Sequence, residues 1–224
     1  MFSKQLDVTT IEAGDITVWL RSGDLGRVDC VTLRPASEPG ELRTLLLIGD
    51  FGSASEDPPA RVEVTGNLHA LDESANFRGA SVAVTPLAAG PSLKFAQVVP
   101  KENWQVDQAA NTDWQRQENC PQNGLQQIIR VTWNGGIVPT SDVADTPNHA
   151  QLYQVTLQTP DGTVRTVQPF AIGDLADNDN NHDLCLDVEG EVQSVFFPGG
   201  HVVDPNQDAN ADSVVTLTAP IPLP

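Results

Sequence analysis

The sequence is poor in basic residues and aromatic residues, and it has no long apolar run. Only 12 Lys and Arg residues stand against 30 Asp and Glu residues, which gives a formal net charge of -18 for 224 residues. A surface field of this sign repels the phosphates of DNA and RNA, so nucleic acid is not expected as a partner. No apolar stretch approaches the roughly 20 residues that cross a bilayer, so no transmembrane segment is expected either. Aromatic residues make up 5% of the chain, which argues against a long cleft that stacks on sugar rings.

Several motifs of common active sites are also missing. The sequence has no GxSxG nucleophile elbow, no glycine-rich phosphate loop and no CxxC pair, and its four histidines lack HxH or HExxH spacing. We therefore expect a binding protein rather than an enzyme. A secreted hydrolase acting on polysaccharide or peptide remains an alternative, because a pair of catalytic carboxylates cannot be recognised by spacing in so acidic a chain.

The three cysteines, Cys30, Cys120 and Cys185, are widely spaced. Cys120 and Cys185 each adjoin a predicted strand in the same half of the chain, as a disulfide across a sandwich requires. Three free buried thiols are the alternative. If the bridge forms, Cys30 is left over.

Short runs rich in Val, Thr, Ile and Leu alternate with clusters of Gly, Pro, Asp and Asn, a pattern typical of strands and turns. The fold class expected is all-β: an immunoglobulin-like antiparallel β-sandwich, as two sandwich domains or one large one, with long acidic loops. The sharpest local signal is YQVTLQT-PDG-TVRTVQPF, which predicts a hairpin whose turn places Gly162 at positive φ. The strands predicted are residues 16–20, 27–35, 42–51, 61–68, 79–87, 92–99, 125–133, 152–159, 163–172, 184–188, 192–197 and 213–219.

Composition suggests where the domains begin and end. Residues 100–124 carry many amides and no alternation, so we expect a connecting segment between a β-sandwich domain at 1–99 and a second one at 125–219. Residues 220–224 contain prolines that cannot donate to a sheet and should form an extended tail.

Two segments near the carboxyl end gather oxygen-bearing side chains, DLADNDNNHDLCLD from Asp174 and DPNQDANADS from Asp204. Calcium takes six to eight oxygen ligands, and the D-x-[DN]-x-[DN] spacing supplies three from one short loop. Crowded carboxylates without a counter-ion would also repel one another. The candidate ligands are Asp174, Asp177, Asp179, Asn181, Asp183, Asp187, Asp204, Asn206, Asp208, Asn210 and Asp212.

Neither segment is an EF-hand, because the sixth and twelfth positions counted from Asp177 are His182 and Val188 instead of Gly and Glu. Asp and Asn also form Asx-turns without any ion, which is the competing interpretation of both segments. His182 and His201, each beside an oxygen-rich segment, are the secondary candidates for a copper or zinc site.

These observations favour an exported protein that is stabilised by calcium and acts as a binding, adhesion or structural module toward a protein or glycan at a surface. A surface or periplasmic copper- or zinc-binding protein is the alternative. The first residues, MFSKQLDVTT, lack the apolar region of a secretory signal, so the expectation of a secreted, periplasmic or cell-surface location rests on composition.

Overall fold

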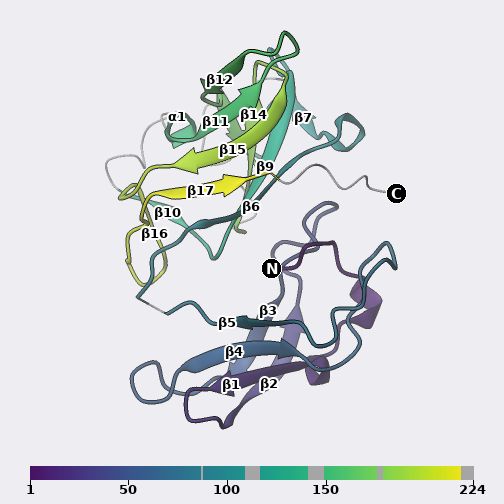
Figure 1. Ribbon diagram of the computed structural model, residues 1–224, viewed down its shortest axis with the longest axis vertical. Coiled ribbons are helices and arrows are strands. Elements are labelled where there is room, and N and C mark those ends of the chain that lie inside the picture. Colours follow the sequence, from purple (N-terminus) through teal and green to yellow (C-terminus); the bar gives the residue numbers. More distant parts are fainter. Residues whose placement is uncertain (87, 109–116, 141–148, 176–178, 218–224) are drawn as a thin grey trace. The chain divides into compact units, whose positions relative to one another are not determined.

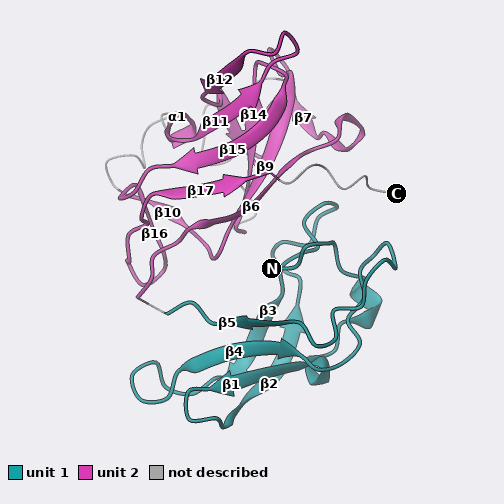
Figure 2. Cartoon of the chain, viewed as in Figure 1, with its two compact units in different colours: residues 1–87, 224 teal, residues 88–223 magenta. Residues whose placement is uncertain are grey.

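The computed structural model describes residues 1–86, 88–108, 117–140, 149–175 and 179–217, and the regular structure in these residues is almost entirely antiparallel β-sheet (Figure 1). The all-β expectation is confirmed. The chain divides into two compact units, Met1–Leu87 and Ala88–Leu223, which Figure 2 colours separately. Within the described ranges, no helix has the length and apolar character needed to cross a bilayer.

Unit 1 contains one five-stranded sheet with the order β3-β2-β1-β4-β5. The strands lie where Val, Ile and Leu alternate with polar residues, and the first matches its predicted bounds. Two short 3-10 turns, η1 (Val8–Thr10) and η2 (Ala13–Asp15), precede them. The strands are β1 (Ile16–Leu20), β2 (Leu25–Thr32), β3 (Leu46–Asp50), β4 (Pro59–Val64) and β5 (Ser81–Ala83).

One face of this sheet covers the small core of unit 1. Because side chains alternate between the faces of a strand, Ile16 and Val64, which are paired across β1 and β4, point to the same side. They pack there with Leu6, Leu33 and Leu68, all of which are buried.

Unit 2 contains two four-stranded sheets, with the orders β13-β14-β9-β6 and β12-β11-β15-β17. The predicted hairpin is confirmed: β11 pairs with β12 around a turn in which Gly162 has φ of 85°. The strand β6, expected in a first domain at 1–99, pairs with β9 and so belongs to unit 2. The strands are β6 (Leu93–Val98), β9 (Gln127–Trp133), β11 (Gln154–Gln158), β12 (Val164–Val167), β13 (Ala171–Gly173), β14 (Asn181–Leu186), β15 (Glu191–Phe197) and β17 (Ser213–Thr216).

The two sheets of unit 2 share one core. Alternate residues of β9 and β14, such as Ile129 and Leu184, face alternate residues of β11 and β15, such as Leu157 and Val195, and all four are fully buried. At the centre, Trp133 lies edge-on to Phe197 with ring centroids 5.1 Å apart. Two layers that bury their apolar faces against each other make unit 2 a β-sandwich.

The segment predicted as a connection, residues 100–124, folds onto unit 2 where it is described. It contains η3 (Lys101–Asn103), β7 (Val106–Asp107) and β8 (Cys120–Pro121). Trp104 donates from Nε1 to the carbonyl oxygen of Val99 at 2.9 Å and joins a second apolar cluster that includes Ile128. Ile128 points away from the main core, so this segment covers the outer side of the β9–β14 sheet.

A disulfide between Cys120 and Cys185, with the Cα atoms 5.6 Å apart, fastens this segment to β14. The pairing considered from the sequence is therefore confirmed. Cys30 is a free and exposed cysteine in unit 1.

Candidate functional site

Several connections between strands of unit 2 meet at one end of the sandwich. Antiparallel pairing sets the end of β9 beside the start of β14, and the end of β15 beside the starts of β11 and β17. Two short strands, β10 (Val138–Pro139) and β16 (Val202–Val203), pair across this end. We call the described parts of residues 134–140, 149–153, 174–180 and 198–212 the loop end. Both oxygen-rich segments contribute to it.

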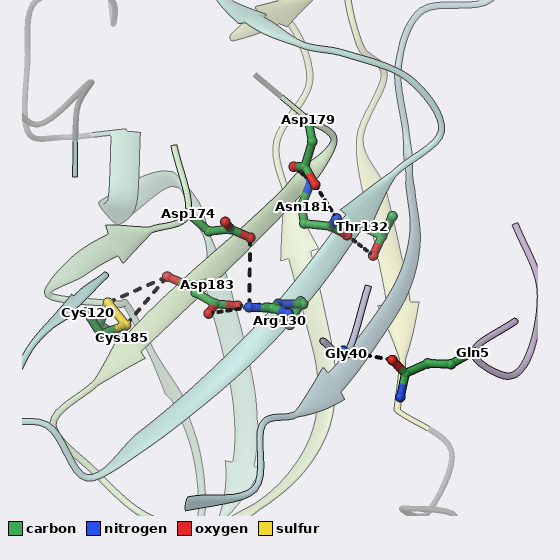
Figure 3. Close-up of polar contacts among 10 residues, drawn as sticks. All are labelled: Gln5, Gly40, Cys120, Arg130, Thr132, Asp174, Asp179, Asn181, Asp183 and Cys185. Carbon is green, nitrogen blue, oxygen red and sulfur yellow. Dashed lines mark hydrogen bonds and ion pairs between the residues drawn. A yellow bond between two sulfur atoms is a disulfide. The ribbon is translucent and has the colours of Figure 1, made fainter. Parts of the chain in front are cut away.

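The first oxygen-rich segment is only partly a loop, because β14 begins at Asn181 and takes Asn181, His182 and Asp183 into the sheet. Asp183 lies directly opposite Arg130 on β9. The guanidinium donates from Nε and Nη2 to the two carboxylate oxygens of Asp183, each at 2.8 Å, and Nη2 lies 3.9 Å from Oδ2 of Asp174 (Figure 3). A bidentate pair of this kind is both strong and geometrically specific. Arg130 therefore supplies the positive charge beside Asp183, where the sequence predicts an ion.

Asp179 and Asn181 are held in a local hydrogen-bonded structure. Asp179 accepts from the backbone N–H of Asn181 through Oδ1 and from its Nδ2 through Oδ2, both at 2.6 Å (Figure 3). The buried Oδ1 of Asn181 in turn accepts from the hydroxyl of Thr132 at 2.7 Å. This arrangement is an Asx-turn, the competing interpretation of the segment.

The second segment divides into a turn and an anchor. In the turn, Oδ1 of Asp204 accepts from the backbone N–H groups of Asn206 and Asp208 at 2.9 and 3.0 Å. This compact turn carries three oxygen-bearing side chains at alternate positions. Asn206 is exposed and Asp208 half-buried, and within the described residues no hydrogen bond is formed by either side chain.

The anchor of the second segment is Asn210, which is buried. Its Oδ1 accepts from the backbone N–H groups of His201 and Val202 at 3.0 and 3.1 Å, and its Nδ2 donates to the carbonyl oxygens of Pro198 and Ala211 at 2.8 and 3.0 Å. Asp212 closes the same loop by accepting from the N–H of Gly199 at 2.8 Å. These side chains fix the shape of the loop and present the Asp204 turn on it.

Among the described ligand candidates, Asp187 lies away from the loop end. Asp187 is exposed and follows the opposite end of β14, about 20 Å along the strand from Asn181 at roughly 3.3 Å per residue. Asp177 lies outside the described residues. Asp183 lies within β14, and Asp174, the first residue of 174–180, lies near the same Arg130 guanidinium. The other described candidates lie in the loop end, except Asn181, which is the first residue of β14.

A buried group of histidine and aromatic side chains lies beneath the loop end. Trp133 donates from Nε1 to the hydroxyl oxygen of Tyr153 at 2.9 Å, and that oxygen lies 2.8 Å from Nδ1 of His182. Because Trp can only donate, the hydroxyl proton of Tyr153 satisfies all three groups when it points to Nδ1, which leaves the imidazole proton on Nε2. The ring of His149 stacks on Tyr153 and lies 5.8 Å from the ring of His182, centroid to centroid.

Burial controls the protonation of this group. Desolvation, with a smaller contribution from His201, lowers the pKa of His149 to about 4. Desolvation, with a smaller contribution from His149, lowers the pKa of His182 to about 3. Burial also raises the pKa of Tyr153. All three side chains are therefore neutral at pH 7. The cluster could not be recognised from local sequence patterns because its members are far apart in the chain.

Comparisons with protein-family models, with curated proteins and with solved structures found no match to this chain.

Proposed function

We propose that the protein is an exported β-sandwich module whose loop end in unit 2 binds a protein or glycan partner at a surface. The proposal rests mainly on one observation: the described parts of three strand connections, residues 134–140, 174–180 and 198–212, lie at the same end of a packed sandwich. Loops held by a rigid scaffold are where binding residues are usually found. The absence of catalytic motifs in the sequence is in keeping with a binding role.

We assign unit 2 an immunoglobulin-like fold. Taking β6, β9, β11, β12, β13, β14, β15 and β17 as strands A, B, C, C′, D, E, F and G, the two sheets have the orders D-E-B-A and C′-C-F-G. This supports the assignment because immunoglobulin-like sandwiches divide their strands in this way. The disulfide of unit 2 joins β8 to strand E, whereas antibody domains bridge strands B and F, so the likeness is one of strand order alone.

The Asp204 turn is the place where we propose that calcium binds. Asp183 is already neutralised by Arg130, and both oxygens of Asp179 accept hydrogen bonds from Asn181. The Asp204 turn carries the side chains of Asp204, Asn206 and Asp208 at alternate positions, and Oδ1 of Asp204 accepts from two backbone N–H groups. The other side-chain oxygens of the turn, together with carbonyl oxygens and water, can supply the six to eight ligands that calcium takes. A bound ion would fix the 198–212 loop for partner binding.

Export is supported by the disulfide between Cys120 and Cys185, because such bonds persist in oxidising compartments. Its apolar surroundings and its position between the outer segment and β14 are those of a structural bridge.

Thermal unfolding of the whole chain in EDTA and in millimolar calcium tests the ion site. A ligand that binds only the folded state at 100 times its Kd stabilises it by about 2.7 kcal/mol, which raises Tm by several degrees. We expect Asp208→Asn to abolish this rise and Asp187→Asn, which removes the same charge at the far end of β14, to retain it. Equal melting temperatures with EDTA and with calcium, or an equal loss in both variants, would contradict the proposal.

A further inference from the structure

An Asn or Asp residue precedes glycine at three places in the chain: Asn123–Gly124, Asn134–Gly135 and Asp161–Gly162. At each pair the backbone nitrogen of the glycine can attack the side-chain carbonyl carbon of the residue before it and close a five-membered ring. Glycine favours this attack because it has no Cβ beside its nitrogen. The two reacting groups belong to adjacent residues, so the step is intramolecular. The hydrogen bonds around each pair decide how readily it reacts.

The pair Asp161–Gly162 is protected by its hydrogen bonds. The N–H of Gly162 donates to the carbonyl oxygen of Thr159 at 2.8 Å, so the attacking nitrogen is already engaged. Hydrogen bonds from the Thr159 hydroxyl and the Thr163 N–H lower the pKa of Asp161 to about 2, which keeps its carboxylate ionised. An ionised carboxylate is a poor electrophile, so we expect this pair to remain intact.

The pair Asn134–Gly135 lies in the loop end directly after β9, and both residues are exposed. Oδ1 of Asn134 accepts from the backbone N–H of Ser92 at 2.8 Å. A donor on this oxygen polarises the amide carbonyl and stabilises the negative charge that develops on the oxygen during attack. Within the described residues, neither the N–H of Gly135 nor Nδ2 of Asn134 makes a hydrogen bond. The attacking nitrogen and the departing amide group are therefore not held by other contacts.

The pair Asn123–Gly124 is exposed as well, but its side chain lacks a donor of this kind. The pair lies in the turn after β8, in which Gly124 has φ of 86°. In the part of the chain that the structure describes, the side chain of Asn123 forms no hydrogen bond. The two Asn–Gly pairs thus share the dipeptide and its exposure and differ in the donor on the side-chain carbonyl, so Asn123 is an internal reference for Asn134.

We propose that Asn134 is a site of spontaneous deamidation that the folded structure favours. The nitrogen of Gly135 gives up its proton and bonds to Cγ of Asn134, and the Cγ–Nδ2 bond breaks as Nδ2 takes up a proton and leaves as ammonia. Water then adds to one of the two carbonyl carbons of the ring and opens it, which gives aspartate or isoaspartate. Either product adds a negative charge to the loop end, and isoaspartate runs the main chain through the former side chain. The reaction does not depend on the partner binding proposed above.

Incubation of the whole chain at mildly alkaline pH, folded and in urea, tests this proposal. Peptide mass spectrometry measures the conversion of Asn134 and Asn123 to aspartate and isoaspartate in the same molecules. In urea we expect similar rates, because both pairs then lie in open chain. In the folded protein Asn134 should react severalfold faster than Asn123, because its Oδ1 alone of the two has a donor. A ratio of the two rates that is no higher in the folded protein than in urea would overturn the proposal.

Gly135→Ala is the variant that tests the attacking nitrogen. A Cβ at Gly135 would meet no atom within 4 Å, and the residue does not lie at positive φ, so the fold should be retained. The added methyl group hinders attack, so the rate at Asn134 should fall by about tenfold while the rate at Asn123 stays the same. An unchanged rate at Asn134 would mean that water attacks the side chain directly, and this result would also overturn the proposal.

Discussion

Lowering the pH from 7 to 5 should destabilise unit 2 through His149 and His182. Both are neutral in the folded protein, with pKa values lowered by burial to about 4 and about 3. In the unfolded chain each returns to a pKa near 6.5. Below pH 6.5 the unfolded chain therefore binds more protons than the folded one, so stability is complete above that pH and is lost as the pH falls.

The magnitude follows from proton linkage. At pH 5 an unfolded histidine with pKa about 6.5 gains about 2 kcal/mol from protonation, while a folded one with pKa of about 4 or below gains almost nothing. The value hardly depends on the folded pKa as long as that pKa stays well below 5. The two residues together should lower the free energy of unfolding by about 4 kcal/mol between pH 7 and pH 5, a large part of the total for a domain of this size.

Urea unfolding in EDTA at pH 7, 6 and 5, followed by tryptophan fluorescence, measures this loss. His149→Phe retains an aromatic ring between Tyr153 and Phe197 and removes one titrating group, so the loss should fall to about 2 kcal/mol. His182→Gln, whose amide oxygen can accept from Tyr153, should have a similar effect. A loss of less than about 1 kcal/mol in the wild type, or an equal loss in the wild type and in a variant with both substitutions, would contradict this role of the two histidines.

Three further predictions concern the covalent and polar framework of unit 2. Replacing Cys120 and Cys185 together by Ser should lower the unfolding free energy by about 4 kcal/mol in urea titrations, from the loop entropy of a bridge spanning 65 residues, and a loss under about 1 kcal/mol would contradict it. Asp183→Asn should lower the unfolding free energy by about 3 kcal/mol in the same assay, because Arg130 then lacks its partly buried counter-charge. Asp187→Asn, the control, should change it by less than about 0.5 kcal/mol, and equal effects of the two substitutions would contradict a stabilising Arg130–Asp183 ion pair. Asn210→Ala should lower the unfolding free energy by about 2 kcal/mol, since two backbone N–H groups and two carbonyls lose their hydrogen-bond partner. Equal stability of Asn210→Ala and Asn206→Ala in calorimetry would argue against the role of Asn210 in fixing the loop.

Much of the strand pattern could be predicted from the sequence because it is local. Apolar and polar side chains alternate in residues 16–20, which form β1. The Pro-Asp-Gly turn, with Gly162 at positive φ, predicts the hairpin of β11 and β12. Hydrophobic alternation and turn residues act over a few positions, so they can be read without knowing the rest of the fold.

The candidate site was harder to predict because its contacts are distant in the chain. The sequence predicts Asp183 in an acidic loop, but its partner Arg130 is 53 residues away, and the two lie opposite each other in the β9–β14 ladder. The sequence predicts His182 beside a polar loop, whereas its hydrogen bond with Tyr153 lies in the interior of the sandwich. No local pattern shows which face of a strand an isolated polar residue occupies when its neighbours are polar too.

We propose above that a calcium ion binds the Asp204 turn at the loop end of unit 2. The most direct measurement is a titration of the isotopically labelled protein with calcium, followed by the backbone amide signals in NMR spectra. If calcium binds there, we expect saturating shifts at one ion per chain, centred on the amides of Asn206, Gln207 and Asp208. Amide signals that stay fixed in millimolar calcium, or weak shifts spread without saturation over exposed carboxylates of both units, would contradict it.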